Sequence, residues 1–291
     1  MASEPVTDLI EQQEWLGPLG DQIQKGVTAA FEAAGPAGQQ IKNALHGTWL
    51  GHPLHPAITD VPIGAWTAAV VLDAMDNIRG GDGFSRASDV AVGVGLLGAA
   101  ASAVTGLTDW TATDGRARKI GLTHGLMNSV GALLFTTSYV MRKQDKREAA
   151  RGFTMLGFAV AMGAAYLGGK LVFSEQVGVN HAAGGPLLPE EFVPVMREDE
   201  LQEGQPKKAN ANGIPVLLVR LEGRICAIQE TCSHAGGPLS EGKIEGNTVV
   251  CPWHASRFSL DDGRVIDGPA THPEPCFEAR VNNGTIEVRA K

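Results

Sequence analysis

The sequence lacks an excess of basic residues, a recognisable export signal and the cysteine pattern of a zinc finger. Its 24 Lys and Arg residues are outnumbered by 32 Asp and Glu residues, and the net charge of −8 argues against a nucleic-acid-binding protein. Residues 1–21 are acidic, without a basic region or an apolar run, so no secretory signal peptide is predicted. None of the four cysteines forms a Cys-x-x-Cys pair, which zinc fingers usually combine with a His-x(3–5)-His pair.

Residues 1–50 are expected to form an acidic tail and two short amphipathic helices. Apolar residues recur at helical spacing from residue 21 to residue 46, and Gly35-Pro36 should divide this stretch in two. Such helices could lie on a membrane surface, but packing on the following domain is the favoured interpretation.

Residues 51–174 contain four apolar stretches, each long enough to cross a bilayer as a helix. They lie at about 57–75, 90–110, 120–141 and 152–173. The stretches are rich in Gly and Ala, and small side chains let membrane helices approach closely. Charged residues gather in the connections, for example from Arg142 to Arg151. We therefore predict a four-helix transmembrane bundle, with a soluble bundle as the alternative.

After an expected linker over 175–190, the pattern changes to short β-strands. Apolar and β-branched runs such as 216–221 and 285–289 are separated by turn residues such as Glu222-Gly223. Residues 191–291 should thus form a small all-β domain. The predicted fold class is multidomain, with an N-terminal all-α transmembrane bundle and a C-terminal all-β domain.

Two short Cys/His clips in the β domain could close around one metal centre. The first is Cys232-Ser-His234 and the second is Cys251-Pro-Trp-His254, and sixteen residues lie between them. Thiolate and imidazole ligands suit both iron and zinc, so the residue types alone leave an iron–sulfur cluster and a structural zinc ion open.

The spacing and surroundings of the clips resemble a Rieske domain over 190–291. Gly236-Gly237-Pro238-Leu239 follows the first clip and Ser256-Arg257-Phe258 follows the second. The resemblance implies a [2Fe-2S] cluster with two cysteines on one iron and two histidines on the other, namely Cys232, Cys251, His234 and His254. It also implies that Gly268-Pro269-Ala270 covers the cluster, and His272 is expected to be an exposed loop residue.

Two features of the respiratory Rieske pattern are missing. There, each clip carries an extra cysteine and the two form a disulfide, whereas Gly237 and Trp253 occupy those places here. Ser256 matches a serine that raises the cluster potential by hydrogen bonding, but Phe258 replaces a tyrosine with the same role. The clips therefore resemble the ferredoxin-type Rieske of bacterial oxygenase systems, and we expect a potential nearer that of ferredoxins.

Three histidines lie near predicted ends of the membrane helices: His52, His55 and His124. In an up-and-down bundle they would share one membrane face with the β domain. The stretch from Gly51 to Pro56 and the helix of His124 resemble a bacterial four-helix membrane family of unknown function. Because polar groups at membrane depth often serve function, these histidines are candidates for binding b-type haem or a quinone. The alternative is that they anchor helix ends and hydrogen-bond within the bundle.

The favoured function is electron transfer in a bacterial inner membrane, in contact with lipid, to or from a redox partner protein, a quinone or a haem. A redox sensor and an electron-transfer subunit of a larger oxidoreductase are the alternatives. No oxygenase catalytic domain is expected, because no region is left for a second iron-binding fold. The absent export signal and disulfide favour the cytoplasmic face for the β domain, whereas the basic connections favour the outside.

Overall fold

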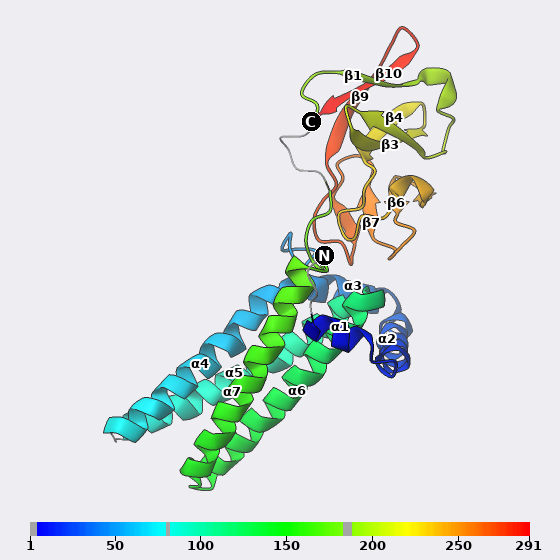
Figure 1. The fold of residues 1–291 in the computed structure, drawn as a ribbon. Coiled ribbons are helices and arrows are strands. Elements are labelled where there is room, and N and C mark those ends of the chain that lie inside the picture. Colours follow the sequence, from blue (N-terminus) through cyan, green and yellow to red (C-terminus); the bar gives the residue numbers. More distant parts are fainter. Residues whose placement is uncertain (1–4, 80–81, 183–187) are drawn as a thin grey trace. The chain divides into compact units, whose positions relative to one another are not determined.

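The structure is a computed structural model that describes residues 5–79, 82–182 and 188–291 (Figure 1). The chain forms two compact units. One is helical and comprises Met1–Gly38 and Leu54–Val177, and the other combines Gln39–Pro53 with Gly178–Lys291. The second unit therefore contains all the strands together with a segment from much earlier in the chain. Residues 183–187 of the expected linker lie outside the described residues.

In the described residues, seven helices precede the strands, one more than the four long and two short helices predicted. They are α1 Pro5–Glu11, α2 Leu16–Ala33, α3 Gly35–His46, α4 Leu54–Arg79, α5 Asp82–Trp110, α6 Gly115–Lys143 and α7 Arg147–Phe173. The long helices α4–α7 match the four apolar stretches, and Gly35, with φ +55°, separates α2 from α3 as predicted. The additional helix is α1, in the expected tail, where Asp8 and Glu11 pair with Arg116 of α6.

Glycines allow the long helices to pack closely, which confirms the role predicted for small residues. A Cβ on Gly95 of α5 would lie 2.2 Å from the indole nitrogen of Trp66 on α4, and one on Gly98 would lie 2.8 Å from Pro62. The ring of Trp66 stacks on Phe135 of α6 with 3.9 Å between centroids. The two aromatic rings thus join three helices in one core.

Three helices of the described chain are long and apolar enough to cross a membrane: α4, residues Gly83–Trp110 of α5, and α7. Between 17% and 28% of each candidate span is buried within the protein, so most of each span is not covered by the described part of the chain. The fourth long helix, α6, begins with charged residues, including Arg116 and Lys119, and packs mainly along α7.

The strands of the described C-terminal part form two antiparallel sheets. The larger has the order β1-β10-β9-β4-β3-β2, and the smaller has the order β5-β6-β7-β8. Their bounds are β1 Val193–Arg197, β2 Lys207–Ala211, β3 Ile214–Leu221, β4 Arg224–Gln229, β5 Lys243–Glu245, β6 Thr248–Val250, β7 Arg257–Ser259, β8 Val265–Asp267, β9 Cys276–Asn282 and β10 Thr285–Ala290.

Strand β3 contributes to two cores, one on each face. Leu217 and Val219 face one core, and Val216 and Leu218 face the other, because side chains alternate along a strand. Burial on both faces explains why β3 is apolar almost throughout. The first core also contains Cys232 and Cys251, so the packed sheets fix the position of both clips.

Candidate metal centre

The first clip lies in a tight loop after β4. The backbone N–H of Cys232 donates to the carbonyl of Gly237 at 2.8 Å, and the N–H of Gly236 donates back to the carbonyl of Cys232 at 2.8 Å. Gly236 has a φ of +79°, which glycine adopts without strain. The turn therefore holds Cys232 and His234 in one small hydrogen-bonded ring.

The second clip, between β6 and β7, repeats this geometry. The N–H of Cys251 donates to the carbonyl of Ser256 at 2.8 Å, and the N–H of Ala255 donates to the carbonyl of Cys251 at 3.1 Å. Ala255 has a φ of +59°, at the position that corresponds to Gly236. An alanine in this conformation is strained, and such strain is common at functional sites. The two loops are thus structural copies.

The loops place two buried thiols within hydrogen-bonding reach of each other. The hydrogen bond with Cys232, together with the backbone N–H groups of Trp253 and His254, lowers the pKa of Cys251 to about 6. The same bond raises the pKa of Cys232. Neither cysteine forms a disulfide. Cys251 therefore readily becomes a thiolate, which is the form that binds metal, with the thiol of Cys232 beside it.

The loops also place two imidazoles together. The ring centroids of His234 and His254 lie 4.9 Å apart, with 85° between the planes. Burial, together with the neighbouring His254, His46 and His181, lowers the pKa of His234 to about 3. A neutral imidazole offers a nitrogen lone pair to a metal.

The four side chains form one sulfur pair and one nitrogen pair. In residues 5–79, 82–182 and 188–291, no three His, Cys, Asp or Glu side chains gather around a position for a single metal ion. Two separate pairs are the arrangement that a Rieske cluster needs, with one pair on each iron. The residues present therefore fit a [2Fe-2S] cluster.

A third loop, after β8, ties the two clips together. The hydroxyl of Ser233 in the first clip donates to the carbonyl of His272 at 2.7 Å. The N–H of Ala270 donates to the hydroxyl of Ser256, after the second clip, at 3.0 Å. The loop that the sequence predicts to cover the cluster thus contacts both halves of the site.

Gly237 and Trp253 lie against each other where the respiratory pattern would have a disulfide. A Cβ on Gly237 would lie 3.0 Å from the sulfur of Cys251 and 3.0 Å from the ring of Trp253. The indole and the glycine therefore fill the space between the loops without a covalent link.

Comparison with known proteins identifies the β domain. Residues 191–278 match the family described as Rieske [2Fe-2S] domain. The chain is 30% identical over 98 residues to the ferredoxin CarAc of Metapseudomonas resinovorans, which covers 33% of this chain and 92% of that protein. The chain belongs to the Rieske family. The Rieske domain is also 31% identical to the anthranilate 1,2-dioxygenase ferredoxin subunit of Burkholderia cepacia, over 34% of this chain and 91% of that one.

The helical domain and the solved structures add two further matches. Residues 51–181 match a family described as Predicted membrane protein (DUF2231). The ferredoxin of carbazole 1,9a-dioxygenase from Nocardioides aromaticivorans is 29% identical and covers 34% of this chain and 98% of its own, with a TM-score of 0.33. The predicted combination of a ferredoxin-like Rieske domain with a membrane domain of unknown function is confirmed.

Sequence reasoning missed one residue of the Rieske site, Glu274. Its side chain is 2% exposed, and Oε1 accepts the backbone N–H of Ser233 at 2.6 Å. Its Oε2 is buried and has no hydrogen-bond partner in the described part of the chain. Burial raises the pKa of this carboxyl to about 8. The one sequence signal for Glu274 is its position between Pro273 and Pro275, which restrict the backbone on both sides of it.

We expect the substitution Glu274→Gln to stabilise the Rieske domain at alkaline pH. A carboxyl whose folded pKa is raised contributes stability that is complete below its ordinary value and is lost as pH rises through about 8. Glutamine keeps an acceptor for Ser233 without ionising, so the gain should reach roughly 2 kcal/mol or more at pH 9 and vanish near pH 5. Denaturant unfolding of both proteins at the two pH values measures it. An equal pH dependence in both would contradict the assignment.

The structure brings His55 and His124 together and leaves His52 elsewhere. The rings of His55 and His124 have 6.4 Å between centroids. His124 Nδ1 lies 2.8 Å from the carbonyl of Ala164, and its Nε2 lies 3.1 Å from the amide nitrogen of Asn128. His52 belongs to the same unit as the Rieske domain, where its exposed ring lies 3.0 Å from the carbonyl of Pro53.

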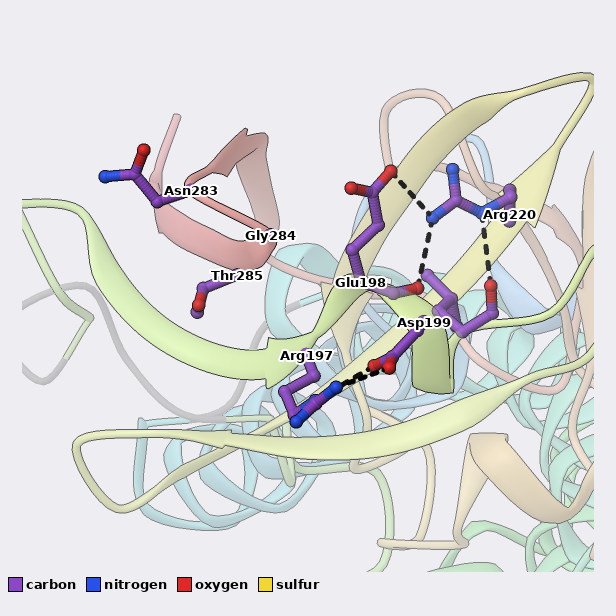
Figure 2. A pocket seen from close by; sticks show the side chains of 8 residues that line it. Arg197, Glu198, Asp199, Arg220, Asn283, Gly284 and Thr285 are labelled. Atoms are coloured by element: carbon purple, nitrogen blue, oxygen red, sulfur yellow. Dashed lines mark hydrogen bonds and ion pairs between the residues drawn. The ribbon is translucent and has the colours of Figure 1, made fainter.

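A groove of about 740 Å³ lies beside the β1–β2 connection, near the hairpin of β9 and β10 (Figure 2). Its charged side chains bind one another: Arg197 pairs with Asp199, and Arg220 pairs with Glu198. Neither clip contributes a lining residue. The groove is therefore not part of the candidate metal site.

Proposed function

We propose that this chain is a membrane-anchored electron carrier with a [2Fe-2S] cluster on Cys232, Cys251, His234 and His254. One observation carries the proposal: two loops of matching geometry supply a buried sulfur pair and an imidazole pair. When bound, the cluster accepts and releases one electron at a time. The chain donates backbone N–H groups to the sulfur of Cys251 and keeps the imidazole of His234 neutral.

We infer that the partner is a redox protein. The relatives named above are ferredoxins, one of them a subunit of a dioxygenase system. A domain of this size without further catalytic groups is suited to pass electrons on. The donor and acceptor of this chain would therefore be oxidoreductases that dock near the clips.

We further propose the inner membrane of a bacterium, with the Rieske domain on the cytoplasmic face. The contact between Gly237 and Trp253, in place of a disulfide, suits a reducing compartment. The basic residues near the spans oppose this placement only weakly, because seven Lys and Arg residues lie on one side of the spans and five on the other. Protease treatment of inside-out vesicles should cleave the Rieske domain, and protection there would reverse the orientation.

For His55 and His124 we infer a packing role within the bundle rather than haem or quinone binding. His124 engages protein groups with both ring nitrogens, so neither is left for iron. A Cβ on Gly106 would lie 2.7 Å from the ring of His55, and one on Gly168 would lie 3.2 Å from the ring of His124. Close backbone on both sides supports this role.

The proposed function is tested by spectroscopy of the full chain purified in detergent. Electron paramagnetic resonance of the reduced protein should give a Rieske signal, and the optical spectrum should lack the Soret band of haem. A purified protein that contains zinc and gives no paramagnetic signal would contradict the proposal.

The substitution Ser256→Ala should lower the cluster potential. Ser256 is fully buried, and its oxygen accepts the N–H of Ala270, which leaves the hydroxyl proton for a cluster sulfur. One hydrogen bond to the reduced cluster corresponds to a shift of roughly 20–60 mV for a one-electron couple. A redox titration measures the shift, with Ser259→Ala, a buried serine on β7, as the matched control. Equal potentials for both variants would remove Ser256 from this role.

A further inference from the structure

The covering loop of the Rieske domain is hydrogen-bonded to a segment that lies more than 200 residues earlier in the chain. Asn43, near the end of α3, donates its Nδ2 to Oδ1 of Asp267 at 2.8 Å. Its Oδ1 accepts the backbone N–H of Gly268 at 3.0 Å. One amide therefore pairs with both a side chain and the backbone of the loop that ties the clips together. We call these two hydrogen bonds the latch.

Close packing continues beyond the latch. His46, the last residue of α3, is 1% exposed. A Cβ on Gly268 would lie 3.0 Å from its ring and 3.3 Å from the side chain of Thr48. His46 is also close enough to His234 to act on it electrostatically. Residues 43–48, here called the strap, thus lie on the histidine side of the metal site.

The strap leaves one approach to the site open. Trp253, beside His254, is 57% exposed, and Pro252 is exposed as well. A small molecule can reach the cluster past these residues. A globular protein needs a wider contact, because even a weak electron-transfer interface buries on the order of several hundred Å² on each partner. Such a contact around His234 would overlap the strap.

We propose that the strap occupies the surface on which a protein redox partner docks, so that electron exchange with such a partner requires the latch to open. The partner is a globular electron-transfer protein, and the strap is its competitor within the same chain. This inference rests on the proposed electron-transfer function. Latch variants should accelerate electron transfer to a protein oxidant and leave transfer to a small oxidant unchanged.

Stopped-flow oxidation of the full chain in detergent tests the competition. The cluster is reduced, excess reductant is removed, and one electron passes from the cluster to one oxidant. The small oxidant is hexacyanoferrate(III), and the protein oxidant is ferric cytochrome c, a basic protein that suits the net charge of −8. The variant Asn43→Ala removes both hydrogen bonds of the latch, and Asp267→Ala removes the one between the two side chains. Gln40→Ala, an exposed amide on the same helix, is the matched control.

Asn43→Ala should raise the rate with cytochrome c roughly tenfold, since it removes both hydrogen bonds that hold the strap closed, and Asp267→Ala, which removes one, should raise it about threefold. With hexacyanoferrate, and for Gln40→Ala with either oxidant, rates should stay within about twofold. If neither oxidant takes an electron from the wild-type cluster, the proposed function itself fails. If both oxidants take an electron, an unchanged rate with cytochrome c in the latch variants contradicts the proposal about the strap and leaves the proposed function intact. Loss of the cluster's paramagnetic signal in both variants also overturns it, because the strap would then hold the site together rather than cover it.

Discussion

Replacing Cys251 with alanine should remove the [2Fe-2S] cluster from the protein. Cys251 is buried, shares a hydrogen bond with Cys232 and receives two backbone N–H groups, so the packed core holds its sulfur in place as a ligand. Loss of one thiolate leaves an iron with a single protein ligand. Iron content and the visible absorption of the purified protein should both fall by more than about tenfold, since even residues that only support a ligand cost that much.

Two other cysteines provide the matched controls. Cys226 and Cys276 pack in or against the same core as Cys251, and neither is in a disulfide. The variants Cys226→Ala and Cys276→Ala remove the same sulfur volume without touching the clips. Both should keep full iron and absorption. A cluster that survives in Cys251→Ala, or disappears in Cys226→Ala, would show that the ligand assignment is wrong.

Replacing Arg142 with leucine should strongly destabilise the helical domain. The guanidinium of Arg142 on α6 is fully buried and forms an ion pair with Asp73 of α4 and another, at 3.0 Å, with Asp89 of α5. It also donates to the hydroxyl of Thr154 on α7 at 2.9 Å. One side chain thus connects all four long helices. Its loss leaves the buried carboxylate of Asp73 with the Ser88 hydroxyl but without an opposite charge, and an uncompensated buried charge typically costs about 3–5 kcal/mol.

Thermal unfolding in detergent, followed by circular dichroism, measures this effect. Lys143→Leu is the matched control, because Lys143 is the adjacent basic residue on α6 and is exposed. It should unfold close to the wild-type temperature, whereas Arg142→Leu should unfold well below it. Arg142→Lys should lie between, because an ammonium keeps the charge but cannot bridge both carboxylates in the same way. Equal midpoints for Arg142→Leu and the control would mean that the network contributes little.

The same residue shows where sequence reasoning reached its limit. From the sequence, Arg142 belonged to a charged connection between spans. In the structure it lies within α6 and is enclosed by polar groups from α4, α5 and α7. The acidic partners are 53 and 69 residues away in the chain, so no local pattern could reveal the pairing.

What the sequence determined by itself is local. Long apolar stretches were enough to predict α4–α7, because a helix that crosses a membrane needs uninterrupted apolar length. The clips were recognisable because a tight loop fixes the spacing between a cysteine and its histidine. The match of the Rieske and membrane domains to known families confirms both readings.

The tertiary structure alone decided which distant residues surround these local features. It buried Glu274 beside the first clip, placed Asn43 on the covering loop and brought the rings of His55 and His124 together. Each of these contacts depends on how whole helices and sheets pack. Packing depends on the combined burial of many side chains from distant parts of the chain, so it cannot be predicted from any short stretch of sequence.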